Sequence, residues 1–266
     1  MLIVKIGGGQ NVNWDYIGED LANLSTKERI ILIHGASGKR DQIARQLGHP
    51  SRVVTSPSGI SSVYTDQSAI DIFLMVYAGL VNKTITAKLQ QYRLKTIGLS
   101  GIDGALWQAK AKKDIYINVD GKIKLLRDNL TGRVEKINLD LISLLLDNGY
   151  LPVICPPAIS FDQEIVNTDN DWATAVMAGQ LHVKKIVVLF EAPGLLKDIN
   201  DPNSLIKKVD KDKINDYQKY AQGRMKKKIL GAQKAIDLGI EKIYWGDARV
   251  KFPITNALAG NGTIIQ

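Results

Sequence analysis

The first apolar segment of the chain, Leu2–Ile6, contains a lysine, Lys5, and is followed at once by the glycines of segment 7–9. Consecutive glycines let backbone N–H groups approach an anion, because no Cβ stands in the way. An ammonium group buried in an apolar strand is unfavourable unless an anion accompanies it. The pattern predicts an anion site at the end of this strand. A tight turn beside a lysine that extends to solvent is the alternative.

A second loop of small residues, HGASGK at 34–39, also follows an apolar segment. It is not a Walker loop, because that motif needs glycine where Ile33 stands and serine or threonine where Arg40 stands. His34 alone is more typical of a structural hydrogen-bonding residue than of a catalyst. We expect the two loops to line one anionic transition state together.

Two segments of the second half carry charges of opposite sign. NTDND at 167–171 precedes a helical pattern, where asparagine and aspartate are favoured caps. A carboxylate here is also placed to hold two lysine ammonium groups near a phosphate, and simple capping is the alternative. GRMKKK at 223–228 opens a helical pattern that runs to Gly239. Lysines in a first helical turn oppose the helix dipole, and a bound anion reverses that penalty.

The elements that must position these residues alternate between apolar strands and helices, as in a parallel sheet covered on both faces. Helical spacing of apolar residues predicts helices around 70–80 and 141–145, the second ending at Gly149. Asp120-Gly121, between 115–119 and 122–126, predicts a hairpin. Ligands of such sheets bind beyond the carboxyl ends of the strands. The candidate strands are Leu2–Ile6, Arg29–Ile33, Lys95–Leu99, Leu151–Cys155, Lys185–Phe190 and Glu241–Trp245.

Composition narrows the class of protein. The 266 residues are 45% hydrophobic and 23% charged, as in ordinary globular proteins. No apolar run approaches the length of a membrane span, so we expect none. The single cysteine, Cys155, excludes an internal disulfide and suits a reducing cytoplasm. The three histidines lie far apart and give no zinc spacing, so we assign no metal-binding residues.

Most of the net charge of +8 lies in one segment. Leu205–Lys234 holds ten basic and three acidic residues, a net of +7, which leaves +1 for the rest of the chain. A localised positive segment predicts an anionic partner, such as nucleotide phosphate, an acidic protein or nucleic acid. A solvated lysine-rich face is the alternative. Nucleic acid is disfavoured, because Tyr217 and Tyr220 are the only aromatic residues of the segment available for base stacking.

Together these segments resemble the amino acid kinase family, within it the branch of acetylglutamate kinases and LysW-type carrier-protein kinases. The resemblance implies a three-layer αβα sandwich, an α/β fold with a mostly parallel central sheet. Residues 1–165 are expected to form a lobe for the acyl substrate and residues 166–266 a lobe for ATP and Mg²⁺, on one continuous sheet. The likeness covers essentially the whole chain and rests on VKIGGG, HGAS, DIFLMVYAGLVNK, GLSGIDG, NGYLPVICPPA, NTDND, PGLL, GRMKKKILGA and GTII in family order.

The resemblance also implies roles for individual residues. Lys5 and Lys228 are expected to contact the transferring phosphoryl group, and Asp171 is expected to organise the two lysines. Segment 190–194 reads FEAPG where relatives have Ser-Asp-Val-x-Gly, which is a departure in the nucleotide site. The expected acyl-substrate residues are Gly8, Gly35, Ala36, Ser37 and Asn167, and the expected nucleotide residues are Gly9, Glu191, Gly194 and Met225.

A second departure concerns substrate choice. Acetylglutamate kinases carry an Arg-Val-Thr motif whose arginine clamps the α-carboxylate of the substrate, and Val63 stands in the place of that arginine here. Valine cannot form the paired hydrogen bonds of a guanidinium group. Arg40, Arg45 and Arg52 are the candidates to supply charge instead. A carrier-linked substrate is favoured, because contacts between the two proteins can share the anchoring.

We therefore expect ATP-dependent phosphorylation of the side-chain carboxylate of aminoadipate, glutamate or both, held on a small acidic amino-group carrier protein, in lysine or arginine biosynthesis. A carboxylate is already ionised, so catalysis needs positioning and charge neutralisation but no general base. The alternatives are an acetylglutamate kinase acting on the free amino acid, and a non-catalytic nucleotide or amino-acid sensor. The resemblance also suggests a homodimer. Variants without Lys228 or Asp171 are expected to fold normally and to lose most turnover.

Overall fold

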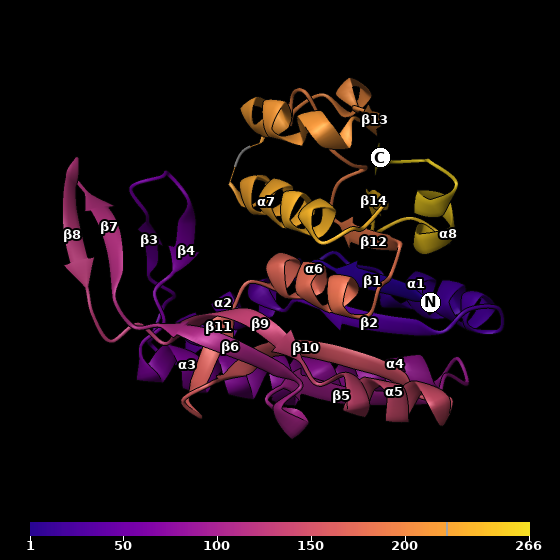
Figure 1. The fold of residues 1–266 in the computed structure, drawn as a ribbon, viewed down its shortest axis with the longest axis horizontal. Coiled ribbons are helices and arrows are strands. Elements are labelled where there is room, and N and C mark those ends of the chain that lie inside the picture. Colours follow the sequence, from indigo (N-terminus) through magenta and orange to yellow (C-terminus); the bar gives the residue numbers. More distant parts are fainter. Residues whose placement is uncertain (222) are drawn as a thin grey trace.

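Apolar strands and amphipathic helices alternate along the chain and fold into one large mixed sheet with helices on both faces (Figure 1). The computed structural model describes residues 1–221 and 223–266. Eleven strands follow the order β11-β9-β6-β10-β2-β1-β12-β14-β15-β13, with β5 beside β10. They are β1 (Leu2–Ile6), β2 (Ile30–His34), β5 (Thr96–Gly101), β6 (Trp107–Lys112), β9 (Thr131–Ile137), β10 (Leu151–Ser160), β11 (Ile165–Thr168), β12 (Lys185–Phe190), β13 (Lys208–Val209), β14 (Lys242–Asp247) and β15 (Thr263–Ile265).

The six neighbouring strands β5-β10-β2-β1-β12-β14 all run parallel. They are the six strands expected from their apolar composition, with small shifts at their ends and a longer β10. Strand β1 lies in the middle, where Val4 is paired with Leu32 on one side and Val187 on the other. The strands that composition did not reveal, such as β6, β9 and β11, extend the sheet beyond β10 and include antiparallel pairs.

The helices complete three layers. Side chains alternate along a strand, so Leu2, Val4 and Ile6 pack with one helical layer, whereas Ile3 packs with the other. Lys5 therefore lies on the Ile3 face. The first layer holds α1 (Trp14–Ser25), α4 (Asn82–Gln90) and α8 (Pro253–Leu258), and the second holds α5 (Leu139–Asp147), α6 (Asn170–Gln180) and α7 (Arg224–Asp237). The expected α/β fold, a three-layer αβα sandwich with a mostly parallel central sheet, is confirmed.

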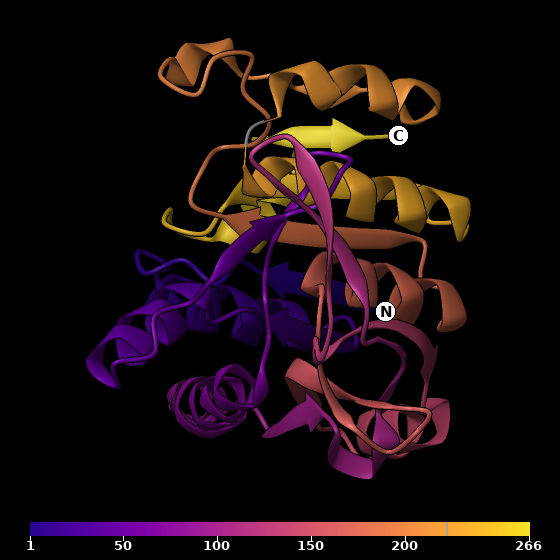
Figure 2. The ribbon, with the colours of Figure 1, turned by 90° about the vertical axis from the view of Figure 1, so that its left-hand side faces the viewer.

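Two hairpins project side by side from one end of the sheet (Figures 1 and 2). The hairpin of β7 (Ile115–Val119) and β8 (Lys122–Leu126) was predicted from Asp120-Gly121, and both of these residues adopt the positive φ of such a turn. The hairpin of β3 (Val53–Thr55) and β4 (Ser61–Val63) was not predicted, because each strand has only three residues. The hairpins wall one side of the cavity described below.

Helical structure runs without interruption from Gln67 to Gln90, through α3 (Gln67–Phe73), a π-helical segment η1 (Leu74–Val81) and α4. In the described residues this is the one helix long and apolar enough to cross a membrane, by length and composition alone. Ile70, Phe73 and Val76 of this helix are buried, so packing accounts for part of its apolar character. The remaining short helices are α2 (Ser37–Gln46), η2 (Asp103–Ala105), η3 (Pro202–Ser204) and η4 (Lys211–Tyr220).

Candidate active site

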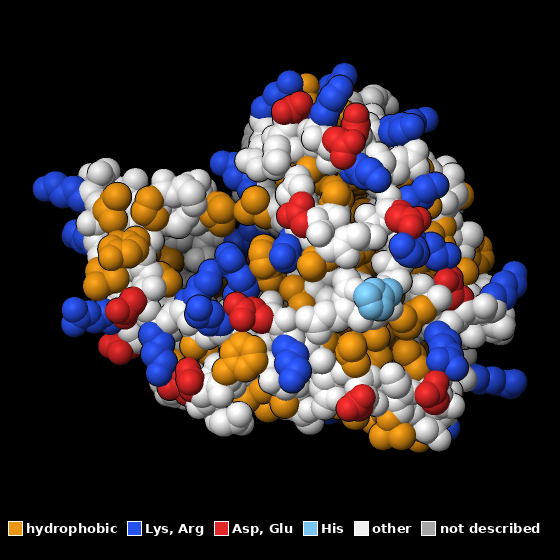
Figure 3. Space-filling model, in the orientation of Figure 1, with side chains coloured by type: hydrophobic (Ala, Val, Ile, Leu, Met, Phe, Trp, Pro, Cys, Tyr) orange, Lys and Arg blue, Asp and Glu red, His pale blue; other side chains and the backbone are white. Residues whose placement is uncertain are grey.

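A cavity of about 1680 Å³ opens at the carboxyl ends of the central strands, between the hairpins and the α6–α7 layer. In Figure 3 it is the hollow beside the projecting hairpins, and lysine and arginine side chains gather near its mouth. Its wall draws on both halves of the sequence, from the glycine loop after β1 to Asp237 at the end of α7. The position is the one expected for ligands of an open parallel sheet. The proposed division into lobes at 165 and 166 stays a prediction.

The two loops of small residues pack backbone against backbone on the floor of this cavity. The Gly38 amide donates to the Gly8 carbonyl (2.8 Å), and the Gly35 amide donates to the carbonyl of Ile6 (2.9 Å). A Cβ added to Gly8 would lie 2.5 Å from the Ser37 nitrogen, and one added to Gly35 would lie 2.8 Å from the Gly8 nitrogen. Side chains are therefore excluded at both positions, because only bare backbone fits. The sequence expectation that the loops share one site agrees with this geometry.

Three charged side chains from distant parts of the chain meet beside these loops. Lys5 Nζ lies 2.7 Å from Asp171 Oδ1, and Lys228 Nζ lies 3.4 Å from the same oxygen. Their side chains are 5%, 15% and 11% exposed for Lys5, Asp171 and Lys228, so all three are removed from bulk water. The cluster holds two positive charges and one negative charge. An anion in the cavity would balance the excess.

Local structure explains why these three meet. Asp169 caps α6 by accepting from the Trp172 amide, which places Asp171 in the first helical turn. Helix α7 then packs against α6 at Gly231, where an added Cβ would lie 2.7 Å from the Cβ of Asp171. This close approach brings Lys228, three residues earlier on α7, within reach of the carboxylate. The sequence signal that was missed is Gly231, a helical glycine with a packing role.

Burial and mutual attraction shift the pKa of each member of the cluster. Burial alone would raise the pKa of Asp171, but Lys228 and Lys5 outweigh it and hold that pKa well below its usual range. Burial alone would lower the pKa of Lys5, but Asp171 outweighs it and raises the pKa. Burial, with repulsion from Lys5, lowers the pKa of Lys228 to about 8 against the attraction of Asp171. Lys228 is thus the ammonium that most lacks an anionic partner.

Most of the residues expected for the acyl substrate also line the cavity. Asn167 lines the wall and donates from Nδ2 to the Thr65 hydroxyl (3.1 Å). Val63 lines the cavity too, which places an apolar side chain where the resemblance led us to look for an arginine. Gly35 and Ser37 also line the cavity, whereas Ala36 is buried behind it.

The residues expected for the nucleotide are only partly brought together. Gly9, Glu191 and Met225 line the cavity, and Glu191 accepts from the Asn11 amide with its carboxylate against Gly9. Gly194 instead packs against Thr263 of β15 and is absent from the described cavity wall. The geometry therefore gives no support to a direct nucleotide contact for Gly194. Phe190 ends β12, and the rest of the altered FEAPG segment follows that strand.

His34 is fully buried behind the second loop. Its Nδ1–H donates to the Gly35 carbonyl (3.2 Å), and its Nε2 accepts from Asn82 Nδ2 (3.0 Å). Burial lowers the pKa of His34 to about 4, against the hydrogen bond to Gly35. The ring is therefore neutral at physiological pH, and its hydrogen bonds hold the loop. This agrees with the structural role expected for His34.

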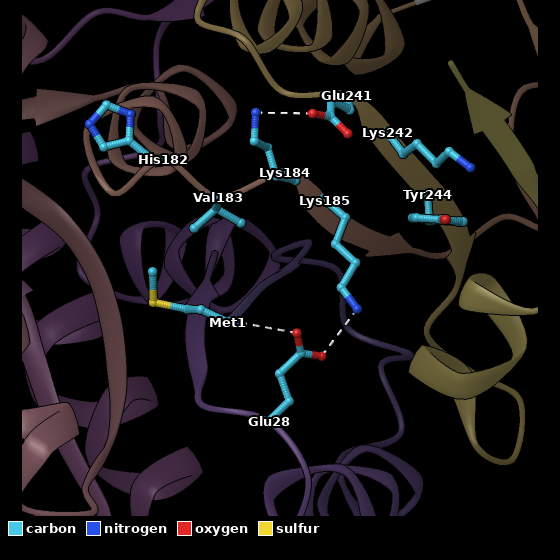
Figure 4. Close-up of a pocket in the computed structure, with 9 residues that line it drawn as sticks. All are labelled: Met1, Glu28, His182, Val183, Lys184, Lys185, Glu241, Lys242 and Tyr244. Carbon is cyan, nitrogen blue, oxygen red and sulfur yellow. Dashed lines mark ion pairs between the residues drawn. The ribbon is translucent and has the colours of Figure 1, made fainter.

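A second, smaller pocket of about 350 Å³ lies at the amino ends of β1, β12 and β14 (Figure 4). Its carboxylates are already paired, since Glu28 pairs with both the amino terminus (3.1 Å) and Lys185 (3.2 Å). Lys184 likewise pairs with Glu241 (3.0 Å). The pocket lies far from the glycine loops and brings no reactive groups together. The large cavity is the candidate active site.

Comparison with known proteins supplies independent information on the family of this chain. The model of the amino acid kinase family matches residues 1–244. A LysW-aminoadipate kinase from Deinococcus radiodurans is 43% identical over 267 residues, which cover 100% of this chain and 91% of that protein. A LysW-aminoadipate kinase from Thermus thermophilus is 40% identical over 269 residues and is covered completely, as is this chain.

A solved structure shows the same fold at lower identity. N-acetylglutamate synthase from Neisseria gonorrhoeae, in complex with coenzyme A and N-acetyl-glutamate, has a TM-score of 0.78 and 21% identity. The match covers 99% of this chain and 58% of that one. At this identity the likeness bears on the fold alone.

Proposed function

Since the chain belongs to the amino acid kinase family, we propose that it transfers the γ-phosphoryl group of ATP to the side-chain carboxylate of aminoadipate or glutamate held on a LysW-type carrier protein. The products are an acyl phosphate and ADP. The observation that carries the proposal is the cluster of Lys5, Asp171 and Lys228 beside the two glycine loops, in a chain that matches LysW-aminoadipate kinases over its full length. This function is favoured over an acetylglutamate kinase and over a non-catalytic sensor.

The residues of the cavity provide what this reaction needs. The attacking carboxylate is already ionised at neutral pH, so no base has to remove a proton. The transition state carries negative charge on its equatorial oxygens, which positioned donors stabilise. We assign this task to the ammonium groups of Lys5 and Lys228 and to the amides of Gly8 and Gly9. Asp171 keeps the two ammonium groups in place. Asn167, Gly35 and Ser37 are assigned to the acyl substrate.

ATP is the phosphoryl donor, and we propose that it is bound with Mg²⁺. The described residues contain no group of three acidic, histidine or cysteine side chains fit to hold a metal alone. Magnesium in kinases needs only one or two carboxylates, because substrate phosphates and water complete its shell. The carboxylate of Glu191 on the cavity wall fits that requirement. Bound there, Mg²⁺ would neutralise phosphate charge. Lys5 and Lys228 would neutralise the charge of the transferring phosphoryl group.

The cavity mouth suits an acidic carrier. Lys112 and Arg133 both line it, and neither forms an ion pair with another described residue. Burial and the proximity of Arg133 lower the pKa of Lys112. Negative charges of an acidic partner nearby would raise that pKa again. Lys234 and Arg133 lie over the ring of Trp172 at 5.1 and 4.3 Å from its centroid. Such a positive rim steers a negatively charged protein toward the site.

A direct comparison of substrates tests the proposed function. We expect purified protein with ATP and Mg²⁺ to form a hydroxamate-trappable acyl phosphate from carrier-linked aminoadipate, and to give at least tenfold lower kcat/KM with free N-acetylglutamate. Carrier-linked glutamate in the same assay shows whether one or both amino acids are accepted. Equal or better turnover of free N-acetylglutamate would identify the alternative kinase. ATP binding without phosphoryl transfer to any of the three substrates would identify a sensor.

The depressed pKa of Lys228 predicts a pH dependence. As pH rises through about 8, Lys228 in the free protein loses its proton, so kcat/KM for ATP should fall on the alkaline side. Bound phosphates favour the ammonium form, so the fall in kcat should lie at higher pH. In Lys228→Arg the side chain stays charged, and any residual activity should lack the limb near pH 8. A wild-type profile that is flat to pH 10, or an arginine variant with the same limb, contradicts this assignment.

We extend the proposal to a cytoplasmic homodimer that acts in lysine biosynthesis and also in arginine biosynthesis. Exposed apolar side chains support the dimer, since Met75 and Leu80 on η1 are 53% and 46% exposed. Covering such side chains against a second copy removes apolar surface from water. Sedimentation at micromolar concentration tests the dimer, and a single species at the 29.3 kDa of one chain would exclude it.

A further inference from the structure

Arg40 is a buried arginine on the wall of the large cavity. Its side chain is 8% exposed, and it lies in the first turn of α2, directly after the second loop of small residues. Its guanidinium group lies over the ring of Phe73, 4.9 Å from the centroid, and that ring stacks on Tyr77. Asp41 holds one edge of the group, because Oδ1 accepts from Nε (3.0 Å) and from Nη2 (2.6 Å). The guanidinium group of Arg40 is therefore fixed in position and orientation.

One nitrogen of this group remains available for a ligand. Nη1 makes no hydrogen bond to the residues that the structure describes, and it is not among the atoms sealed from solvent. A buried guanidinium group with an unused donor is unfavourable unless an anion or water completes its bonding. Because Arg40 lines the cavity, that partner must come from the cavity. The other arginines of the described wall, Arg45 and Arg133, are exposed and lack this fixed setting.

The chemistry of the substrate indicates which anion this is. Aminoadipate or glutamate joined to a carrier through its amino group keeps two carboxylates, of which only the side-chain carboxylate reacts. The second carboxylate must be bound if the first is to be aimed at the phosphoryl group. Val63, which also lines the cavity, offers it no charge or side-chain hydrogen bond. We propose that Arg40 binds the non-reacting carboxylate of the substrate and thereby sets substrate orientation and choice, an inference that rests on the proposed function.

The test pairs two substrates with two variants of Arg40. One substrate is carrier-linked aminoadipate, and the other is the same molecule with its non-reacting carboxylate converted to a carboxamide. For the carboxylate substrate we expect Arg40→Met to raise KM by ten- to a hundredfold and to change kcat less than threefold. For the carboxamide substrate, wild type and Arg40→Met should have the same KM. Arg40→Lys should fall between them for the carboxylate, because an ammonium group keeps the charge but not the planar fork.

Arg52 provides a matched control. It lies over the ring of Tyr64 at 5.2 Å, much as Arg40 lies over Phe73, but it is not part of the described cavity wall. Arg52→Met should leave KM for both substrates unchanged. Introducing Val63→Arg into Arg40→Met should recover most of the lost affinity for the carboxylate substrate. Circular dichroism and thermal melting establish that each variant is folded, and Arg40→Lys carries the test if Arg40→Met is not.

Two results overturn the inference. Arg40→Met with the wild-type KM for the carboxylate substrate would show that Arg40 does not bind it. Equal losses on both substrates would assign Arg40 a structural role only. Calorimetric titration of the carrier-linked substrate separates this from the proposed function. If Arg40→Met weakens binding of the carboxylate form alone, while wild type binds it without producing ADP, the carboxylate site stands and the kinase function fails.

Discussion

Lys228→Met is expected to lower kcat by a factor on the order of 10² to 10³ or more, the loss seen when one preorganised donor is removed from a charged transition state. The surroundings of Lys228 explain why the expected loss is large. Its ammonium group is 11% exposed and shares one carboxylate with Lys5, so it keeps unsatisfied attraction for an incoming anion. Methionine has similar length but no charge. Turnover is measured as ADP release in the presence of saturating carrier-linked substrate.

Folding should survive this substitution. Removing Lys228 leaves Lys5 and Asp171 as one close pair at 2.7 Å, and it relieves the repulsion between two buried ammonium groups. Lys226, exposed on the same turn of α7 and outside the described cavity wall, is the matched control. Lys226→Met should keep wild-type kcat and KM. A Lys228→Met protein within tenfold of wild-type kcat would refute the role assigned to Lys228.

The sequence was most informative where one physical requirement determined the residue type. Six parallel strands buried on both faces require nearly continuous apolar segments, and all six were predicted. Gly8 and Gly35 were identified because anion-binding loops need bare backbone, and the structure shows that no Cβ fits at either position. Lys5 was identified because a lysine in an apolar strand needs an anionic partner, and Asp171 is in contact with it.

The sequence was least informative where contacts between distant segments determine structure. Strands β6, β9 and β11 are held by pairing beyond β10, and their mixed polar composition carries no burial signal. Nothing in the spacing of Arg40 and Val63 shows that both line one cavity. The sequence around Gly231 does not show that α6 packs against this helical glycine. Gly194 packs against Thr263 of β15, and its contact with the nucleotide stays a prediction.

Asp171→Asn should abolish turnover, and the structure adds a second effect that the sequence did not suggest. The carboxylate is the shared partner of two buried ammonium groups. An amide leaves both without a counter-charge, and breaking a buried ion pair in this way costs about 3–5 kcal/mol of stability. We therefore no longer expect variants of Asp171 to fold as well as wild type. Denaturant unfolding at neutral pH measures the loss.

A double variant separates stability from catalysis at this position. Lys5→Met combined with Asp171→Asn removes one of the two stranded charges, so the unfolding free energy should recover part of the loss. Turnover should not recover, because the donor at the end of β1 is now also missing. If Asp171 is the shared counter-charge of both lysines, the effects of the two substitutions on unfolding free energy should not add, and turnover should stay low. If Asp171→Asn instead unfolds with the wild-type free energy, the two ammonium groups do not depend on Asp171. The carboxylate then cannot be what holds them at the phosphoryl group.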